Sequence, residues 1–202
     1  MRRLPILGAA VLVAALLTAC GPSGPKRVLS QPPAPPRTGA PRPFTQVDRP
    51  VNLAKFDSDP CSLLTKEQVA AAVTDPPNNV TPVRKYAPPA SGCSWVNLRG
   101  ATMSALRPVN APTTLTELSA YRLDRHDRLE PWAETSIDGL PAVVYHMFRD
   151  MDECTVSIQV TEKQMLTFEI QGKDLPGSYW DKDRCGGVEK MAELVIGNLR
   201  QG

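Results

Sequence analysis

Proline restricts where this chain can build a core. Nine of its 21 prolines lie within residues 21–50, beside five Lys or Arg and a single acid, Asp48. Proline fixes its own φ and pushes the preceding residue toward extended geometry, so this segment is typical of a semi-rigid spacer with about 3 Å per residue. We therefore expect the folded part to be residues 51–202, which suffice for a single domain.

Residues 1–19 have the three regions of a secretory signal peptide. Arg2 and Arg3 precede an apolar run from Leu4 to Leu17, and small residues close the segment. The run of about 14 residues is shorter than the roughly 20 that a membrane-spanning helix needs. We expect this signal peptide to be removed during export.

The end of the signal peptide, Leu17-Thr18-Ala19-Cys20, resembles the lipobox of bacterial lipoproteins. The resemblance implies that Cys20 receives diacylglycerol, can be labelled with palmitate, and becomes the first residue of the mature protein. Two or three acyl chains anchor a protein far more firmly than one. The alternative is an ordinary cleaved signal that leaves Cys20 as a free thiol, which an oxidising compartment disfavours. We expect an extracytoplasmic protein, anchored to the cell membrane by lipid at Cys20 and tethered by residues 20–50.

Charge is divided unevenly between the tether and the domain. Residues 21–50 carry a net charge of +4, whereas residues 51–202 hold 16 Lys or Arg against 20 Asp or Glu. A mature chain with 21 basic and 21 acidic residues lacks the basic surface of a nucleic-acid binder. The expected partners are the membrane, through the lipid anchor, and an unknown envelope component or protein.

Segments with helical spacing and segments with strand-like alternation share residues 51–202. Helices are expected within 59–73, 114–125 and 187–199, and strands at 93–98, 102–106, 134–137, 142–148, 154–160 and 165–170. Strands joined by hairpins, with helices at the ends and in the middle, indicate an α+β domain. We predict an antiparallel sheet of about five or six strands with helices packed on one face.

Four cysteines remain once Cys20 is assigned to lipid: Cys61, Cys93, Cys154 and Cys185. An even number in an exported protein predicts two disulfides, although four cysteines permit three pairings. We favour Cys93 with Cys154, since both begin expected strands, and Cys61 with Cys185, since both precede expected terminal helices. No local C-x-x-C pair occurs, so no metal site is expected.

Catalytic signatures are sparse. His126 is expected at a solvated helix end and His146 on a sheet surface, and neither lies in a G-x-S-x-G motif. Neither of the two glycine-rich nucleotide-binding motifs is present, so no cofactor is expected. The acids Asp150, Asp152 and Glu153 are interpreted as a solvated hairpin turn rather than a calcium site. No catalytic residue is predicted. An envelope hydrolase stays the least favoured alternative, because a catalytic triad is defined by its geometry and can lack a sequence motif.

Three aromatic residues in expected loops, Trp132, Tyr179 and Trp180, are candidates for a binding face, with packing against the core as the alternative. The favoured hypothesis is a non-catalytic binding or interaction module in the cell envelope. The alternative is a sensor or carrier of a small apolar ligand, held in a pocket between the sheet and the helices.

The order of short motifs along the chain gives a family resemblance. The motifs are Asp59-Pro60-Cys61-Ser62-Leu63-Leu64-Thr65, Cys93-Ser94-Trp95, Gly139-Leu140-Pro141-Ala142, Cys154-Thr155-Val156 and Cys185 before the last helix. With the lipobox and the tether, they resemble short actinobacterial secreted lipoproteins with a domain of unknown function, the mycobacterial Lpr-type group. The resemblance implies a localisation and a fold, and it supplies no catalytic residue.

Overall fold

The computed structural model describes residue 44 and residues 47–73, 79–86, 89–124, 129–147, 152–172 and 183–201. Its internal contacts divide the chain into residues 1–36 and 37–202, and all described residues belong to the second unit. Within those ranges, no helix is long and apolar enough to cross a membrane. The signal segment, Cys20 and most of the tether lie outside the described residues.

The domain is built on one antiparallel sheet of seven strands, which confirms the expected α+β class with a higher strand count. The spatial order is β1-β2-β3-β7-β6-β5-β4. The strands are β1 (Val80–Lys85), β2 (Ala90–Asn97), β3 (Thr102–Pro108), β4 (Trp132–Ile137), β5 (Leu140–Tyr145), β6 (Glu153–Thr161) and β7 (Gln164–Gln171). The helices are α1 (Ala54–Ser58), η1 (Pro60–Leu63), α2 (Lys66–Val73), α3 (Leu115–Asp124) and α4 (Arg184–Gln201).

The strand that the sequence did not predict is β1. It contains Pro82, which cannot donate to a strand ladder, and most of its side chains are exposed, so it lacks apolar alternation. Its position at the edge of the sheet explains why the proline is tolerated.

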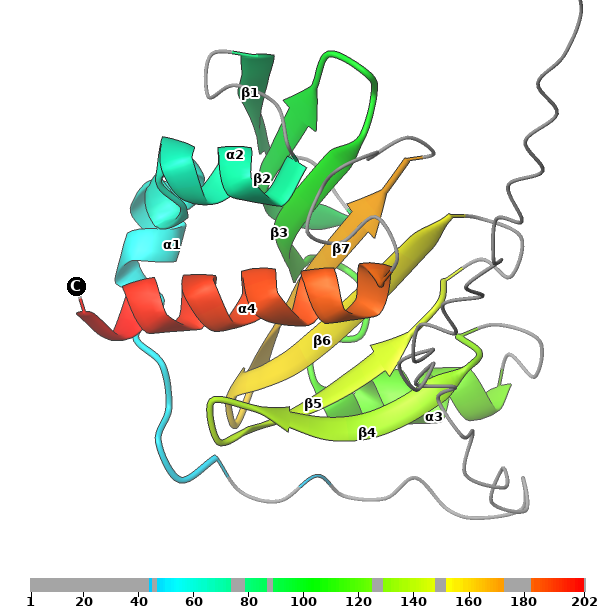
Figure 1. Cartoon of the computed structure of the whole chain (residues 1–202). Helices are drawn as coiled ribbons and strands as arrows, with labels where there is room; N and C mark the ends of the chain where they lie inside the picture. The colour runs from blue at the N-terminus through cyan, green and yellow to red at the C-terminus, as the bar shows by residue number, and fades with distance from the viewer. Residues whose placement is uncertain are drawn as a thin grey trace, which may run out of the picture. The chain divides into compact units, whose positions relative to one another are not determined.

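One face of the sheet, here called the first face, carries the main core. Figure 1 shows α4 lying across this face, with α1 and α2 beside it. Alternate side chains of β6 point to this face because successive residues of a strand face opposite sides. The buried side chains of β6 and α4 in this core are Cys154, Val156, Ile158, Val160, Val188, Met191, Ala192, Val195, Ile196 and Leu199.

The opposite face, here called the second face, is only partly covered. α3 packs there with Leu115 and Leu118 against Val143, Tyr145 and Met165 in a smaller core. The start of α3 is fixed by the backbone N–H of Leu115, which donates to the side chain of Gln159 at 2.7 Å. α3 has ten residues and packs over β5, β6 and the Met165 end of β7.

The two disulfides join Cys61 to Cys93 and Cys154 to Cys185, so the expected pairings Cys93–Cys154 and Cys61–Cys185 were wrong. The physical reason lies in the strand order. Cys93 in β2 and Cys154 in β6 are separated by β3 and β7, about 14 Å at the usual strand spacing. Each cysteine of the sheet instead meets the helical segment packed on the first face, η1 or α4, at a Cα–Cα distance of 5.0 or 5.3 Å.

Candidate functional site

A cavity of about 1140 Å³, here called the hollow, lies over the second face of the sheet. Its polar floor consists of side chains from β2, β3 and β7, and its apolar walls come from β3, α3, β7 and the neighbouring loops. The polar floor is Ser94, Thr102, Ser104, Thr167, Glu169 and Gln171. The apolar walls are Leu106, Leu118, Tyr121, Leu129, Met147 and Met165.

The strand register explains why polar side chains gather there. Ser94 pairs with Ser104, and Ser104 pairs with Glu169, so these three side chains lie in one row on the same face. The alternate residues on the same strands, such as Met103 and Phe168, point into the main core. The sheet therefore has one apolar face under the helices and one hydroxyl-rich face under the hollow.

The hydroxyl groups of the second face bond to one another. The Oγ atoms of Ser94 and Ser104 are 2.9 Å apart, and Ser157 Oγ lies 2.9 Å from Thr167 Oγ1 and 3.1 Å from Tyr145 Oη. Burial raises the pKa of Tyr145, so its phenol stays neutral and can either donate or accept. Hydroxyl side chains that both donate and accept are suited to a polar ligand group.

Glu169 is the carboxyl group of the polar floor. It is half-buried, and burial raises its pKa above the ordinary value, with the nearby Glu153 acting in the same direction. Hydrogen bonds from Ser104 and Gln171, and the charge of Lys85, act in the opposite direction. The net effect is a raised pKa, so Glu169 holds its proton more readily than a solvated glutamate does.

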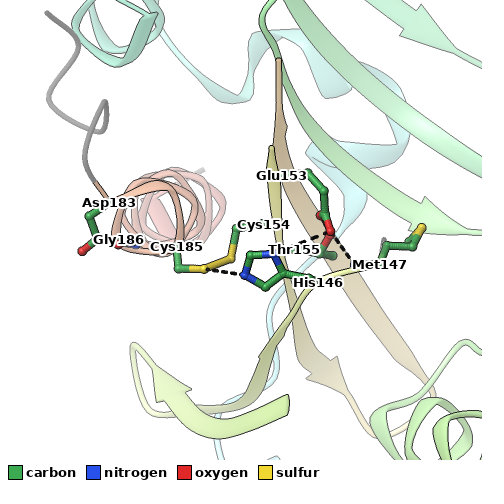
Figure 2. The surroundings of a disulfide bond; sticks show 8 residues. All are labelled: His146, Met147, Glu153, Cys154, Thr155, Asp183, Cys185 and Gly186. Atoms are coloured by element: carbon green, nitrogen blue, oxygen red, sulfur yellow. Dashed lines mark hydrogen bonds and ion pairs between the residues drawn. A yellow bond between two sulfur atoms is a disulfide. The ribbon is translucent and has the colours of Figure 1, made fainter. Parts of the chain in front are cut away.

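A second polar cluster surrounds the Cys154–Cys185 disulfide (Figure 2). His146 Nε2 is 3.7 Å from Cys185 Sγ, and His146 Nδ1 is 4.0 Å from Glu153 Oε1. Glu153 also accepts bonds from the backbone N–H of Met147 at 2.6 Å and from the hydroxyl of Thr155 at 3.0 Å.

Two residues of this cluster, Glu153 and His146, had been given positions by the sequence analysis. Glu153 was expected in a solvated turn, and that was wrong: as the first residue of β6 it points to the second face and is 2% exposed. His146 directly follows β5 and is half-buried beside the disulfide. His126 and Asp150 lie outside the described residues.

A metal-like grouping occurs at the same place. Within the described part of the chain, His146, Cys154 and Cys185 bring ligand atoms within 4.8 Å of one another. Two of these atoms are the sulfurs of the disulfide, already bonded to each other. Because thiolates, not disulfide sulfurs, are metal ligands, the oxidised cluster offers one histidine only.

The comparison with protein families covers nearly the whole chain. A family model described as a protein of unknown function, DUF3558, matches residues 15–198. The chain belongs to this family. The match includes every helix and strand from α1 to β7 and nearly all of α4. No curated protein and no solved structure matches the chain.

Of the aromatic residues singled out in the sequence, Trp132 is the one that can be placed. It begins β4 rather than lying in a loop, and it is half-buried against the smaller core. Its ring stacks on Tyr145 with the centroids 5.8 Å apart, and the guanidinium of Arg122 lies 4.9 Å from its ring centroid. Tyr179 and Trp180 lie outside the described residues, so the proposed three-residue binding face stays a prediction.

Glu169 and the polar floor were missed by the sequence analysis. The signal was present, because β6 and β7 place Thr155, Ser157, Thr167 and Glu169 at alternate positions. Alternation of this kind is also what a strand with one solvated face shows. The distinguishing feature is composition: short hydroxyl side chains in place of the lysines and arginines common on a solvated face.

Proposed function

We propose that this protein is a membrane-anchored lipoprotein of the cell envelope whose domain binds a small amphipathic molecule in the hollow. The single observation that carries the proposal is the hollow itself, about 1140 Å³ with apolar walls and a polar floor. Small-molecule sites are usually concave, mostly apolar, and provided with a few polar groups that orient the ligand.

This proposal combines the binding module with its alternative, the carrier of a small ligand. A purely apolar ligand fits the walls, but it offers no hydrogen bond to the remaining acceptor sites of the Glu169 carboxyl, which Ser104 and Gln171 satisfy only in part. Unsatisfied buried polar groups are costly, about 1–3 kcal/mol each. An amphipathic ligand satisfies both surfaces, with its polar end on the floor and its apolar part against the walls.

The anchor is proposed from the sequence. Residues 1–19 would act as the signal peptide, Cys20 as the lipidated residue and residues 20–50 as the tether, as in the actinobacterial lipoproteins that the chain resembles. An anchored domain stays close to a membrane, where amphipathic molecules concentrate. The anchor and the hollow would thus serve the same ligand chemistry.

Cys20→Ala tests the anchor. We expect the variant to lose palmitate labelling and to be either left unprocessed or released from the membrane, because no thioether can form. The measurement is metabolic labelling followed by membrane fractionation, with Gln31→Ala in the tether as a control that should label normally. Continued labelling of Cys20→Ala would rule out the lipobox interpretation.

Leu106→Trp tests the hollow. Leu106 lies on β3 among the apolar walls, so an indole there would fill space that the ligand needs. With N-phenyl-1-naphthylamine as a fluorescent apolar probe, we expect saturable binding to the parent chain and at least about tenfold weaker binding to the variant. Both proteins carry Cys20→Ala, so that no acyl chain competes for the hollow.

The matched control is Leu98→Trp, in the β2–β3 turn, where the leucine is 78% exposed and away from the hollow. It should bind the probe like the parent chain. The proposal fails if the parent shows no saturable binding, or if folded Leu106→Trp binds as tightly as Leu98→Trp.

A further inference from the structure

Acidic and basic side chains lie at different places around the polar floor. Glu169 lies on β7, the central strand of the sheet, and Glu153 lies on the same face of the adjacent β6. The cation that faces Glu169 from the sheet is Lys85, three strands away on β1, where its side chain is exposed. Arg84 of β1 also lines the hollow, but its guanidinium donates to the backbone carbonyl of Ser58. The centre of the floor is therefore acidic, and the two basic residues lie on the edge strand.

The other charged groups near this face interact with partners other than Glu169. Arg122 of α3 bonds to Glu130 at 2.7 Å, and Arg107 of β3 points to the first face and bonds to Asp57. His146 lies beyond Glu153, beside the disulfide. Tyr145, across from Thr155, stays neutral because burial raises its pKa.

Glu169 has no built-in counter-ion within the described residues, where no Lys, Arg or His nitrogen lies within 4.0 Å of its carboxylate. Its neighbours are the hydroxyl of Ser104 and the amide of Gln171. A carboxylate that is half-buried beside a second acid is costly to ionise alone, and an incoming cation would remove that cost.

The donors of an ammonium group fit this set of acceptors. A primary ammonium carries three N–H donors and no acceptor. Glu169 offers carboxylate oxygens and Ser104 a hydroxyl oxygen on the floor, while the side-chain amide of Gln171 donates to the same carboxylate. A hydrogen bond from an ammonium to a carboxylate is about twice as strong as one between neutral groups. An anionic head group would instead meet the carboxyl of Glu169.

We propose that the hollow selects molecules with a protonated amine head, which Glu169 binds as its counter-ion, and an apolar body that lies along Leu106, Leu118 and Met165. This inference rests on the proposed function, since it names the head group of the ligand that the hollow would hold. The probes are therefore chosen to separate the two claims.

Three probes of equal chain length isolate the head group: hexylamine, hexan-1-ol and hexanoate. By isothermal titration of the chain carrying Cys20→Ala, we expect hexylamine to bind at least about tenfold more tightly than hexan-1-ol, and hexanoate to bind most weakly. Glu169→Gln keeps the side-chain shape and removes the charge. It should lower hexylamine affinity to that of hexan-1-ol and leave hexan-1-ol affinity unchanged.

The control variant is Glu193→Gln, an exposed glutamate of α4 on the other side of the sheet, which should keep the preference for the amine. Equal affinity for amine and alcohol would overturn the head-group inference and leave the binding function standing. Binding of none of these probes, together with no saturable fluorescence of the naphthylamine, would remove the binding function itself.

Proton linkage gives a second readout. Because burial holds the pKa of Glu169 above its ordinary value, the free site keeps its proton to a higher pH than a solvated glutamate does, and an ammonium favours the ionised carboxylate. Hexylamine binding should therefore release a proton and tighten as pH rises from about 4 to about 7. Titrations in two buffers of different ionisation enthalpy measure the release. Glu169→Gln should abolish it, and equal release from that variant would assign the proton to another group.

Discussion

Removing the Cys154–Cys185 disulfide with the double variant Cys154→Ala/Cys185→Ala will lower the free energy of unfolding by about 3–4 kcal/mol. The bridge closes a loop of sequence separation 31 and ties the first turn of α4 to β6. Without it the unfolded chain regains the entropy of that loop. The measurement is urea denaturation, monitored by far-ultraviolet circular dichroism, at several protein concentrations.

The other disulfide is a matched comparison. Cys61–Cys93 has a separation of 32, so chain entropy predicts nearly the same loss for Cys61→Ala/Cys93→Ala. Peptide mapping under non-reducing conditions should recover the pairs 61–93 and 154–185. A loss below about 1 kcal/mol for both double variants would contradict the expected effect of loop closure.

The pairing of the cysteines illustrates what sequence could not supply. That Cys93 and Cys154 lie in strands could be predicted from the alternation around them, and both do lie in strands, β2 and β6. Whether those strands are neighbours is a property of the sheet order, which hairpin patterns determine only locally. β7 pairs with β3, and this long-range pairing places two strands between the two cysteines.

The helices and strands of the domain were easier to predict from the sequence than the site was. Six of the seven strands follow from local alternation, because an apolar residue at every second position indicates a strand with one buried face. The hollow depends instead on where α3 lies. The same Ser and Thr residues would be a solvated surface if nothing stood beside them, and a closed core if α3 extended over β3.

Gly92→Ala should be among the most damaging single substitutions in the domain. Gly92 lies in β2 with φ +154°, and a Cβ there would overlap the carbonyl oxygen of Ala105 in the paired strand β3. Because that oxygen belongs to the backbone, the strands must separate to admit a methyl group. We expect a loss of about 3–5 kcal/mol in the free energy of unfolding, measured by urea denaturation.

The effect should reach the hollow, because Gly92 is two residues from Ser94, whose hydroxyl bonds to Ser104 across the same pair of strands. Separating β2 from β3 moves that part of the polar floor, so probe binding should weaken even where the variant remains folded. Gly100→Ala is the control: its φ is also positive, at +84°, yet a Cβ there meets nothing within 4 Å. It should cost only the backbone strain, roughly 1–2 kcal/mol, and leave binding intact. If both alanine variants lose the same stability, the contact with β3 is not what requires glycine at position 92.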